Sequence, residues 1–159
     1  MQSVRNHWFD QLAVVLAAGV VYYFVVTRLL GYAAAIAAPS WLFPFMEQHP
    51  SAGLLIMSLL THIPAIAVAA AIVGYGLARL LPSRHFLFGV VTVCVMVLLA
   101  AVAAIGGLGF WVQLRESVIP RYVFAVPTLF ALWLFLPIAA HWFARSRRSK
   151  DNARAAASA

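Results

Sequence analysis

The amino-acid sequence predicts an all-α integral membrane protein, a four-transmembrane-helix bundle with both termini in the cytoplasm. Hydrophobic residues make up 65% of the 159 residues and charged residues only 9%, whereas an ordinary soluble domain has roughly 25% charged residues. The sequence contains four apolar stretches, each long enough at ~20 residues to cross a bilayer as a helix. Lys and Arg gather at alternate ends of these stretches, which sets the orientation.

The first apolar stretch begins after Asp10 and is interrupted by Arg28. Pro39 and Pro44 disfavour a continuous helix beyond it, so we predict a first span over residues 11–35. A basic start followed by an apolar run also resembles a cleavable signal peptide. The run is too long for such a signal and an acidic residue is out of place there, so we expect the span to be retained, with cleavage as the alternative.

The other three spans are expected over residues 52–78, 86–109 and 122–144, each flanked by a charge, a proline or both. Residues 39–46 are too apolar for a free loop and contain a tryptophan, so we expect them to lie along the membrane surface or to fold onto the bundle. The basic, Ala-rich tail, residues 145–159, is predicted to be a disordered cytoplasmic segment that could also bind anionic lipid.

Charge determines the predicted topology. Eight of the eleven Lys and Arg residues fall on one predicted side of the membrane: Arg5, Arg79, Arg84, Arg145, Arg147, Arg148, Lys150 and Arg154. Cytoplasmic flanks are enriched in these residues, so residues 39–51 and 110–121 are placed outside and the chain in the plasma membrane, specifically a bacterial inner membrane. The formal net charge of +7 is thereby explained by topology, and we expect no nucleic-acid partner.

The segment around His62 holds the first candidate functional residues, because it lies about ten residues into its span and hence near the bilayer midplane. Pro64 lacks an N–H, so the carbonyl of Leu60 loses its helical donor. Thr61 is expected to donate back to the carbonyl of Met57. We favour a neutral histidine that forms hydrogen bonds between helices at a proline kink; the alternative is a ligand-contacting or proton-handling role.

Antiparallel spans would bring further polar and aromatic residues to the depth of His62. Pro137 deprives the carbonyl of Trp133 of its usual donor, which makes Trp133 a candidate member of this layer, although a kinked packing helix is the favoured interpretation. Small residues also recur at four-residue spacing and support a compact bundle without identifying its contacts: Ala13 and Ala17, Ala70 and Gly74, Ala103 and Gly107. The other residues expected at this depth are Tyr22, Tyr23, Cys94, Met96 and Thr128.

Arg28 is predicted near the outer edge of the hydrocarbon, where its long side chain can extend to the interface. Tyr32 one turn away could meet its guanidinium, and Glu47 or Glu116 could supply a counter-charge. The alternative is an inward-facing arginine that binds an anion. The candidate intramembrane polar site therefore consists of Thr61, His62, Pro64, Arg28 and Trp133.

No cofactor, metal site or catalytic residue is predicted. Haem with two histidine ligands needs both at one depth, yet His62 is central while His7, His85 and His141 lie near the cytoplasmic edge. Those three could converge on a metal but lack carboxylate or thiolate partners at coordinating spacing. Cys94, the single cysteine, excludes an internal disulfide and a CxxC motif.

The favoured functional hypothesis is a non-enzymatic accessory or structural subunit of a membrane complex, with the lipid bilayer and other membrane subunits or further copies of itself as partners. The alternative is an oligomeric transporter of small solutes or lipids, with His62 and Arg28 lining the path. A haem-binding or catalytic membrane protein is the third hypothesis.

Overall fold

The computed structural model describes the backbone of residues 2–105 and 118–157 and the side chains of residues 8–102, 127–152 and 155–157. Within these ranges the chain is all-helical and contains no strand. Four of its helices are long and apolar enough to cross a membrane, as the sequence predicts. The elements are α1 (Gln2–Ala34), the 3-10 helix η1 (Ser40–Leu42), α2 (Phe43–Gln48), α3 (Pro50–Leu80), α4 (His85–Ile105) and α6 (Val118–Ala157).

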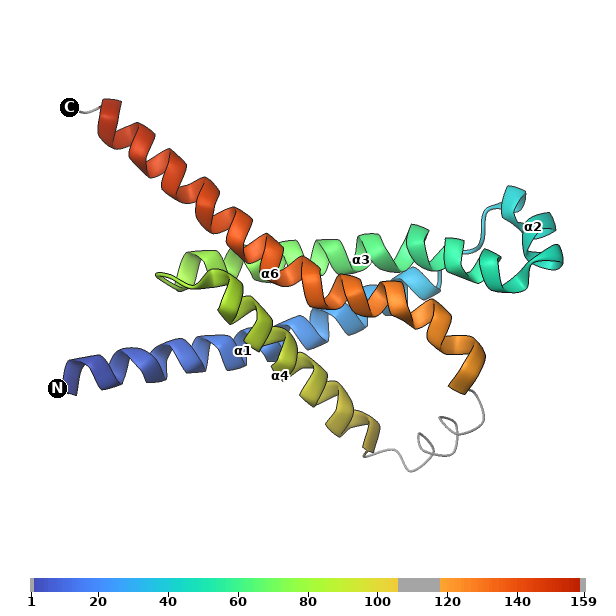
Figure 1. The fold of residues 1–159 in the computed structure, drawn as a ribbon, viewed down its shortest axis with the longest axis horizontal. Coiled ribbons are helices and arrows are strands. Elements are labelled where there is room, and N and C mark those ends of the chain that lie inside the picture. The colour runs from blue at the N-terminus through green and yellow to red at the C-terminus, as the bar shows by residue number, and fades with distance from the viewer. Residues whose placement is uncertain (1, 106–117, 158–159) are drawn as a thin grey trace.

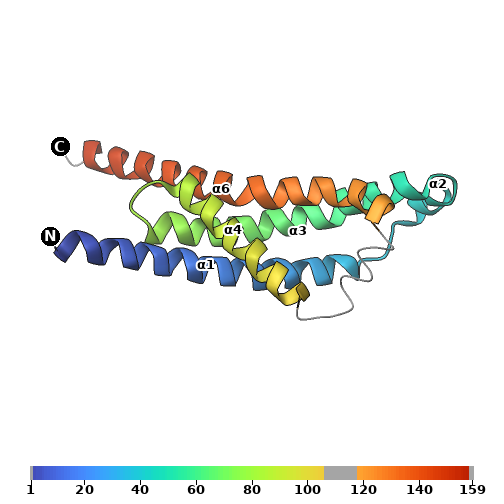
Figure 2. The same cartoon turned by 60° about the horizontal axis from the view of Figure 1, so that its bottom comes forward.

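The four long helices alternate in direction, so that α1 and α4 run one way and α3 and α6 the other (Figure 1). Both termini and the turn at residues 81–84 therefore lie at the same end of the bundle, as a second view confirms (Figure 2). The most extensive packing joins α3 to α6. Helix α1 contacts both α3 and α4, and α4 crosses over to reach α6 while touching α3 little.

Each spanning helix contributes buried apolar side chains to one core. Tyr22 of α1, Ala69 of α3, Val93 of α4 and Leu136 of α6 are all fully buried in this cluster. Only 22–28% of each spanning segment is buried inside the chain. The remaining apolar surface must be covered by lipid or by partner helices, because water does not reach it in a bilayer.

The segment between α1 and α3 folds back onto the bundle, which was one of the two expectations for it. Pro44 occupies the first turn of α2, where a missing N–H is tolerated. Helix α2 then packs on α3 so closely that a Cβ on Gly53 would lie 3.1 Å from the Cα of Met46. In the preceding 3-10 helix, Leu42 is buried while Trp41 remains exposed.

Small residues let the helix backbones approach one another. A Cβ added at Gly74 of α3 would lie 2.9 Å from the backbone nitrogen of Ala140 in α6. A Cβ at Gly89 of α4 would lie 2.7 Å from the Cα of Pro137, also in α6. Ala70, one turn before Gly74, is also buried.

The C-terminal part of the chain differs from its expectation as a disordered tail, because α6 continues without a break through Ala157. Its sequence beyond Ala144 consists largely of Ala, Arg and Lys, which are among the best helix formers. This extension diverges from the rest of the bundle (Figure 1). The predicted spans 52–78 and 122–144 fall inside α3 and α6, and span 86–109 follows α4 as far as Ile105, beyond which it lies outside the described residues.

Candidate functional site

The hydroxyl of Thr61 is used within its own helix. Its Oγ1 donates to the carbonyl of Met57 at 2.8 Å, which confirms the back-bond expected from the sequence. Pro64 lies inside α3, which continues through it to Leu80. The hydroxyl of Thr61 is therefore already hydrogen-bonded within α3, close to the proline.

Ser58 is the residue near His62 that sequence reasoning missed. It is buried, and its Oγ lies 3.4 Å from Nδ1 of His62 and 3.2 Å from Oγ1 of Thr128 in α6. The four-residue spacing of Ser58 and His62 was a usable signal, because such residues lie on the same face of a helix. The result is a chain of polar side chains that links α3 to α6 within the membrane.

The wider polar layer expected at this depth is only partly assembled. Tyr22 and Met96 are buried in the core, whereas Trp133 is 39% exposed and Cys94 is also exposed. The described contacts do not join Trp133 to His62. Thr128 is the expected member of the layer that does reach the His62 group, through Ser58.

Tyr22 has a fully buried hydroxyl without a hydrogen-bond partner among the described residues. Its ring belongs to the core cluster, which also contains Val93 and Met96. A buried polar atom that has no partner is uncommon in a folded protein. No feature of the sequence distinguishes Tyr22 from Tyr23 in this respect.

Arg28 lies on the exposed surface of α1, six residues before the helix ends at Ala34. The structure gives its side chain no hydrogen bond, ion pair or ring contact within the part of the chain that it describes. Its neighbour Tyr32 is exposed as well, and the candidate counter-charge Glu116 lies outside the described residues. Arg28 and His62 are therefore not joined by any described contact.

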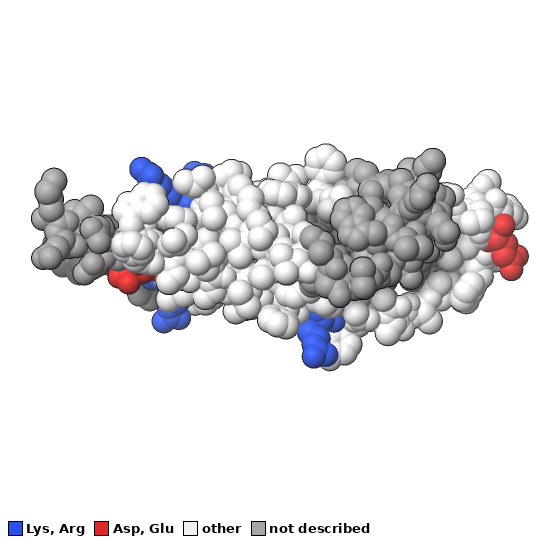
Figure 3. Space-filling model, turned by 90° about the horizontal axis from the view of Figure 1, so that it is seen from below, with Lys and Arg blue, Asp and Glu red and all other residues white. Residues whose placement is uncertain are grey.

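Basic side chains gather at the end of the bundle that carries both termini, which we call the basic end and define by Arg79, Arg84 and residues 145–150. The face in Figure 3 shows Lys and Arg near this end, while most of its described length is uncharged. Arg147 of α6 donates to the carbonyl of Ala78 at 3.2 Å. This bond satisfies one of the last carbonyls of α3 and places a positive charge at the negative end of the helix dipole.

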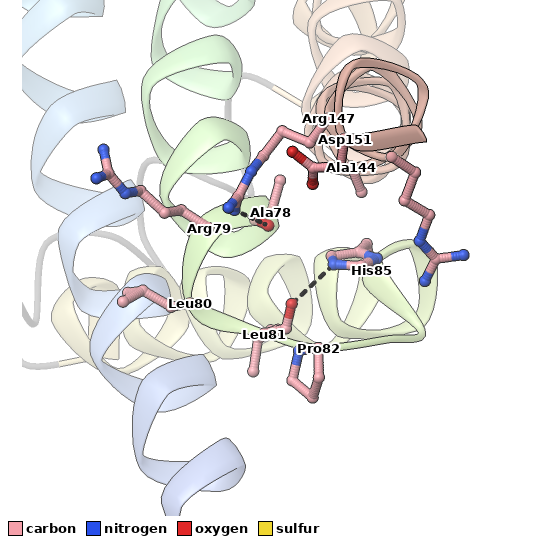
Figure 4. A pocket seen from close by; sticks show the side chains of 10 residues that line it. Ala78, Arg79, Leu80, Leu81, Pro82, His85, Ala144, Arg147 and Asp151 are labelled. Carbon is pink, nitrogen blue, oxygen red and sulfur yellow. Dashed lines mark hydrogen bonds between the residues drawn. The ribbon is translucent and has the colours of Figure 1, made fainter. Parts of the chain in front are cut away.

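His85 anchors the turn between α3 and α4. It is 7% exposed, and its Nε2 lies 2.9 Å from the carbonyl oxygen of Leu81, as Figure 4 shows together with the bond from Arg147. A carbonyl only accepts, so Nε2 carries the proton and Nδ1 is left for another partner. Arg84, just before, has a φ of 55°, a left-handed conformation in which glycine is favoured over residues with a side chain.

Three adjoining hollows open between these residues. The central one, about 480 Å³, lies between the end of α3, the turn and α6, and is lined by both Arg148 and Asp151. A second, about 470 Å³, is lined by Tyr75, Arg79 and Asp151. The third, about 460 Å³, lies on the α4 side of α6. No acidic residue lines it, and we call it the acid-free hollow.

Two of the three histidines that were considered as metal ligands lie near each other. His85 and His141 line the same acid-free hollow, while the side chain of His7 lies outside the described residues. The described side chains contain no group of three His, Cys, Asp or Glu residues that could hold a metal ion.

Comparisons with protein-family models, with curated proteins and with solved structures find no match to this chain.

Proposed function

We propose that this chain is a small polytopic protein of the bacterial inner membrane that acts as a non-enzymatic accessory or structural subunit of a larger membrane complex. Both termini and the turn at residues 81–84 face the cytoplasm in this proposal. The distribution of charge supports this orientation, since the end of the bundle that holds them is the basic end.

The use of polar side chains inside the spans supports a packing role. Thr27, Thr61 and Thr92 each donate to the carbonyl four residues earlier, at 2.7–2.8 Å. A hydroxyl bound in this way uses its proton in a hydrogen bond within its own helix. A transport path instead needs polar groups that are free to contact a solute.

The observation that carries the proposal is the open space around two glycines on outer helix faces. A Cβ added at Gly31 of α1 or at Gly76 of α3 would meet no atom within 4 Å. Glycine is unfavourable in a helix by ~1 kcal/mol relative to alanine, and neither of these glycines allows a close contact inside the chain. In a membrane, small residues let a second helix approach.

The surroundings of Gly76 fit a contact with a partner helix. Ile72 and Tyr75, four residues and one residue before it, are both large and exposed. Ile72 lies one turn from Gly76 on the same face of α3. Tyr75 instead turns toward α6, where its ring contacts Phe143, and Gly74 also faces α6. Gly76 therefore lies in a shallow apolar surface that a neighbouring membrane subunit would cover.

Substitution of the open glycines tests the proposal. Gly76→Leu and Gly31→Leu, made separately in the tagged full chain in its native membrane, add bulk where this chain has no neighbour. We expect each variant to keep the melting temperature of the wild type, and at least one to reduce the mass of the particle extracted in mild detergent. Wild-type particle mass in both variants would contradict the proposal.

The oligomeric transporter remains a second candidate because of the polar chain formed by Ser58, His62 and Thr128. Such a chain between two helices is the kind of feature found along proton paths. In this candidate His62 lines the path, and Arg28 lies at its outer mouth in the oligomer. A His62→Gln variant separates the two candidates, as described in the Discussion.

A further inference from the structure

The acid-free hollow at the basic end has the composition of an anion-binding site. It is lined by the guanidinium-bearing side chains of Arg84, Arg145 and Arg148 and by the imidazoles of His85 and His141, with Phe86 as an apolar wall. The two neighbouring hollows of similar size both include Asp151, and this one has no carboxylate.

The charges in this hollow are not neutralised within the described chain. The side chains of Arg84, Arg145 and Arg148 form no ion pair or hydrogen bond with any described residue. By contrast, Arg147 donates to Ala78 and Arg79 to the hydroxyl of Tyr75. The arginines of this hollow are therefore free to bind a ligand, whereas their neighbours already have partners in the bundle.

The backbone adds to the positive field. Helix α4 begins at His85, so the positive end of its dipole lies at the wall of the hollow. Arg84 holds a left-handed φ of 55°, where a glycine would fit without strain. An arginine in this position brings a positive side chain to the hollow at a conformational cost.

The depth of the hollow matches that of lipid headgroups. His85, which lines it, is the first residue of a membrane span. Phe86 and Trp142, which follow the two lining histidines, are both exposed. Exposed aromatic side chains at a helix end are typical of the interface between hydrocarbon and water.

We propose that this hollow binds the phosphate group of an anionic phospholipid from the leaflet at the basic end. Guanidinium groups from the turn and from α6 would contact the phosphate oxygens, for which their planar shape is suited. The apolar wall at Phe86 lies where the acyl chains would begin. A lipid in this place would join α4 to α6, and the proposal holds whatever complex the chain belongs to.

The test uses the purified full chain in detergent micelles and measures the binding of short-chain phosphatidylglycerol and phosphatidylcholine by native mass spectrometry. The test variant is Arg84→Gln/Arg145→Gln, which removes two charges found only in this hollow among the three. The matched control, Arg79→Gln/Lys150→Gln, removes two charges from the same end but outside this hollow. Thermal melting of each variant checks that it remains folded. If the double variant Arg84→Gln/Arg145→Gln does not remain folded, the single variant Arg145→Gln replaces it.

We expect the wild type to bind phosphatidylglycerol on the order of tenfold more tightly than phosphatidylcholine. The test variant should lose about thirtyfold in affinity for phosphatidylglycerol, since it lacks two basic residues and each contributes on the order of 1 kcal/mol near an anionic surface, while the control should change much less. Equal losses in the two variants, or no loss in the test variant, would overturn the proposal. Displacement of the lipid by millimolar inorganic phosphate would overturn the assignment to a lipid and indicate a site for free phosphate.

Discussion

Ser58 has one hydroxyl proton and two partners, so it donates in at most one of the two hydrogen bonds and accepts in the other. The chain from Thr128 through Ser58 to His62 can therefore run in either direction, depending on which ring nitrogen of His62 carries the proton. The bond between Ser58 and Thr128 links α3 to α6, and His62 joins this chain from within α3 through Ser58. Structural and proton-handling roles of His62 use the same geometry and differ only in whether the ring must titrate.

The variant His62→Gln separates these roles. An amide has both a donor and an acceptor, and hydrogen bonds inside membranes contribute only ~0.6 kcal/mol on average, so we expect wild-type insertion and a melting temperature within a few degrees. Activity of the complex measured from pH 5 to 8 should be unchanged. A folded variant that has lost a pH-dependent activity would instead support the transporter, because glutamine does not titrate in this range.

Arg28 allows a second test at this scale. If its side chain extends to the interface, Arg28→Lys should be nearly neutral in expression level and detergent melting temperature, because both side chains keep a hydrated charge. Arg28→Gln should be the worse of the two. Bidentate anion binding predicts a large loss for Arg28→Lys as well, and a loss as great as that of Arg28→Gln would contradict the interface position.

The local features of the candidate site were predictable, and the contacts between helices were not. The bond from Thr61 to Met57 depends only on helical spacing, so the sequence predicted it. The link from Ser58 to Thr128 depends on how α3 and α6 are rotated about their axes. These helices are apolar on nearly every face, so periodicity does not fix that rotation, and Trp133 was placed in a layer that it does not join.

Helix α3 has two glycines with opposite surroundings only two residues apart. Gly74 is enclosed by the backbone of α6, and Gly76 is open. At Gly74 a methyl group would push two helices apart, a form of overpacking that costs about 1–3 kcal/mol. At Gly76 the same methyl group has space and improves helix propensity.

The matched pair Gly74→Ala and Gly76→Ala measures this difference. We predict that Gly74→Ala lowers the detergent melting temperature of the purified chain, while Gly76→Ala leaves it equal or slightly higher. Circular dichroism at 222 nm during heating follows both. A reversed order would show that α3 is rotated differently against α6.

The extension of α6 shows why composition alone predicted the C-terminal segment poorly. A run of basic and small residues is typical of a solvated, unfolded segment. Arg and Ala, however, also favour the extension of a helix that has already formed. Here α6 is a packed helix up to Ala144, and the bond from Arg147 to Ala78 fixes the next turn. The helix then continues to Ala157.

At the scale of the whole molecule, hydropathy and charge were enough to predict the four helices and the common end of the two termini. Hydropathy works because each span must satisfy its backbone internally, so long apolar segments form helices. The sequence does not reveal which lipid or partner covers the outward faces, since lipid and a partner helix favour the same apolar side chains.

The proposed orientation predicts the result of reporter fusions. Fusions at Ser83 and at the C-terminus should report the cytoplasm, and fusions near Gln48 and Ser117 should report the opposite side. An alkaline phosphatase and a fluorescent-protein fusion at each position provide complementary signals. An inverted signal at any of the four positions would contradict the topology.

The most direct measurement of the central claim is the mass and polypeptide composition of the particle that contains this chain, extracted from its native membrane in mild detergent. An accessory subunit predicts a particle well above the 17.3 kDa of the single chain, with a second polypeptide at fixed stoichiometry through two purification steps. A particle that contains this chain alone, as a monomer or as a homo-oligomer, would contradict it.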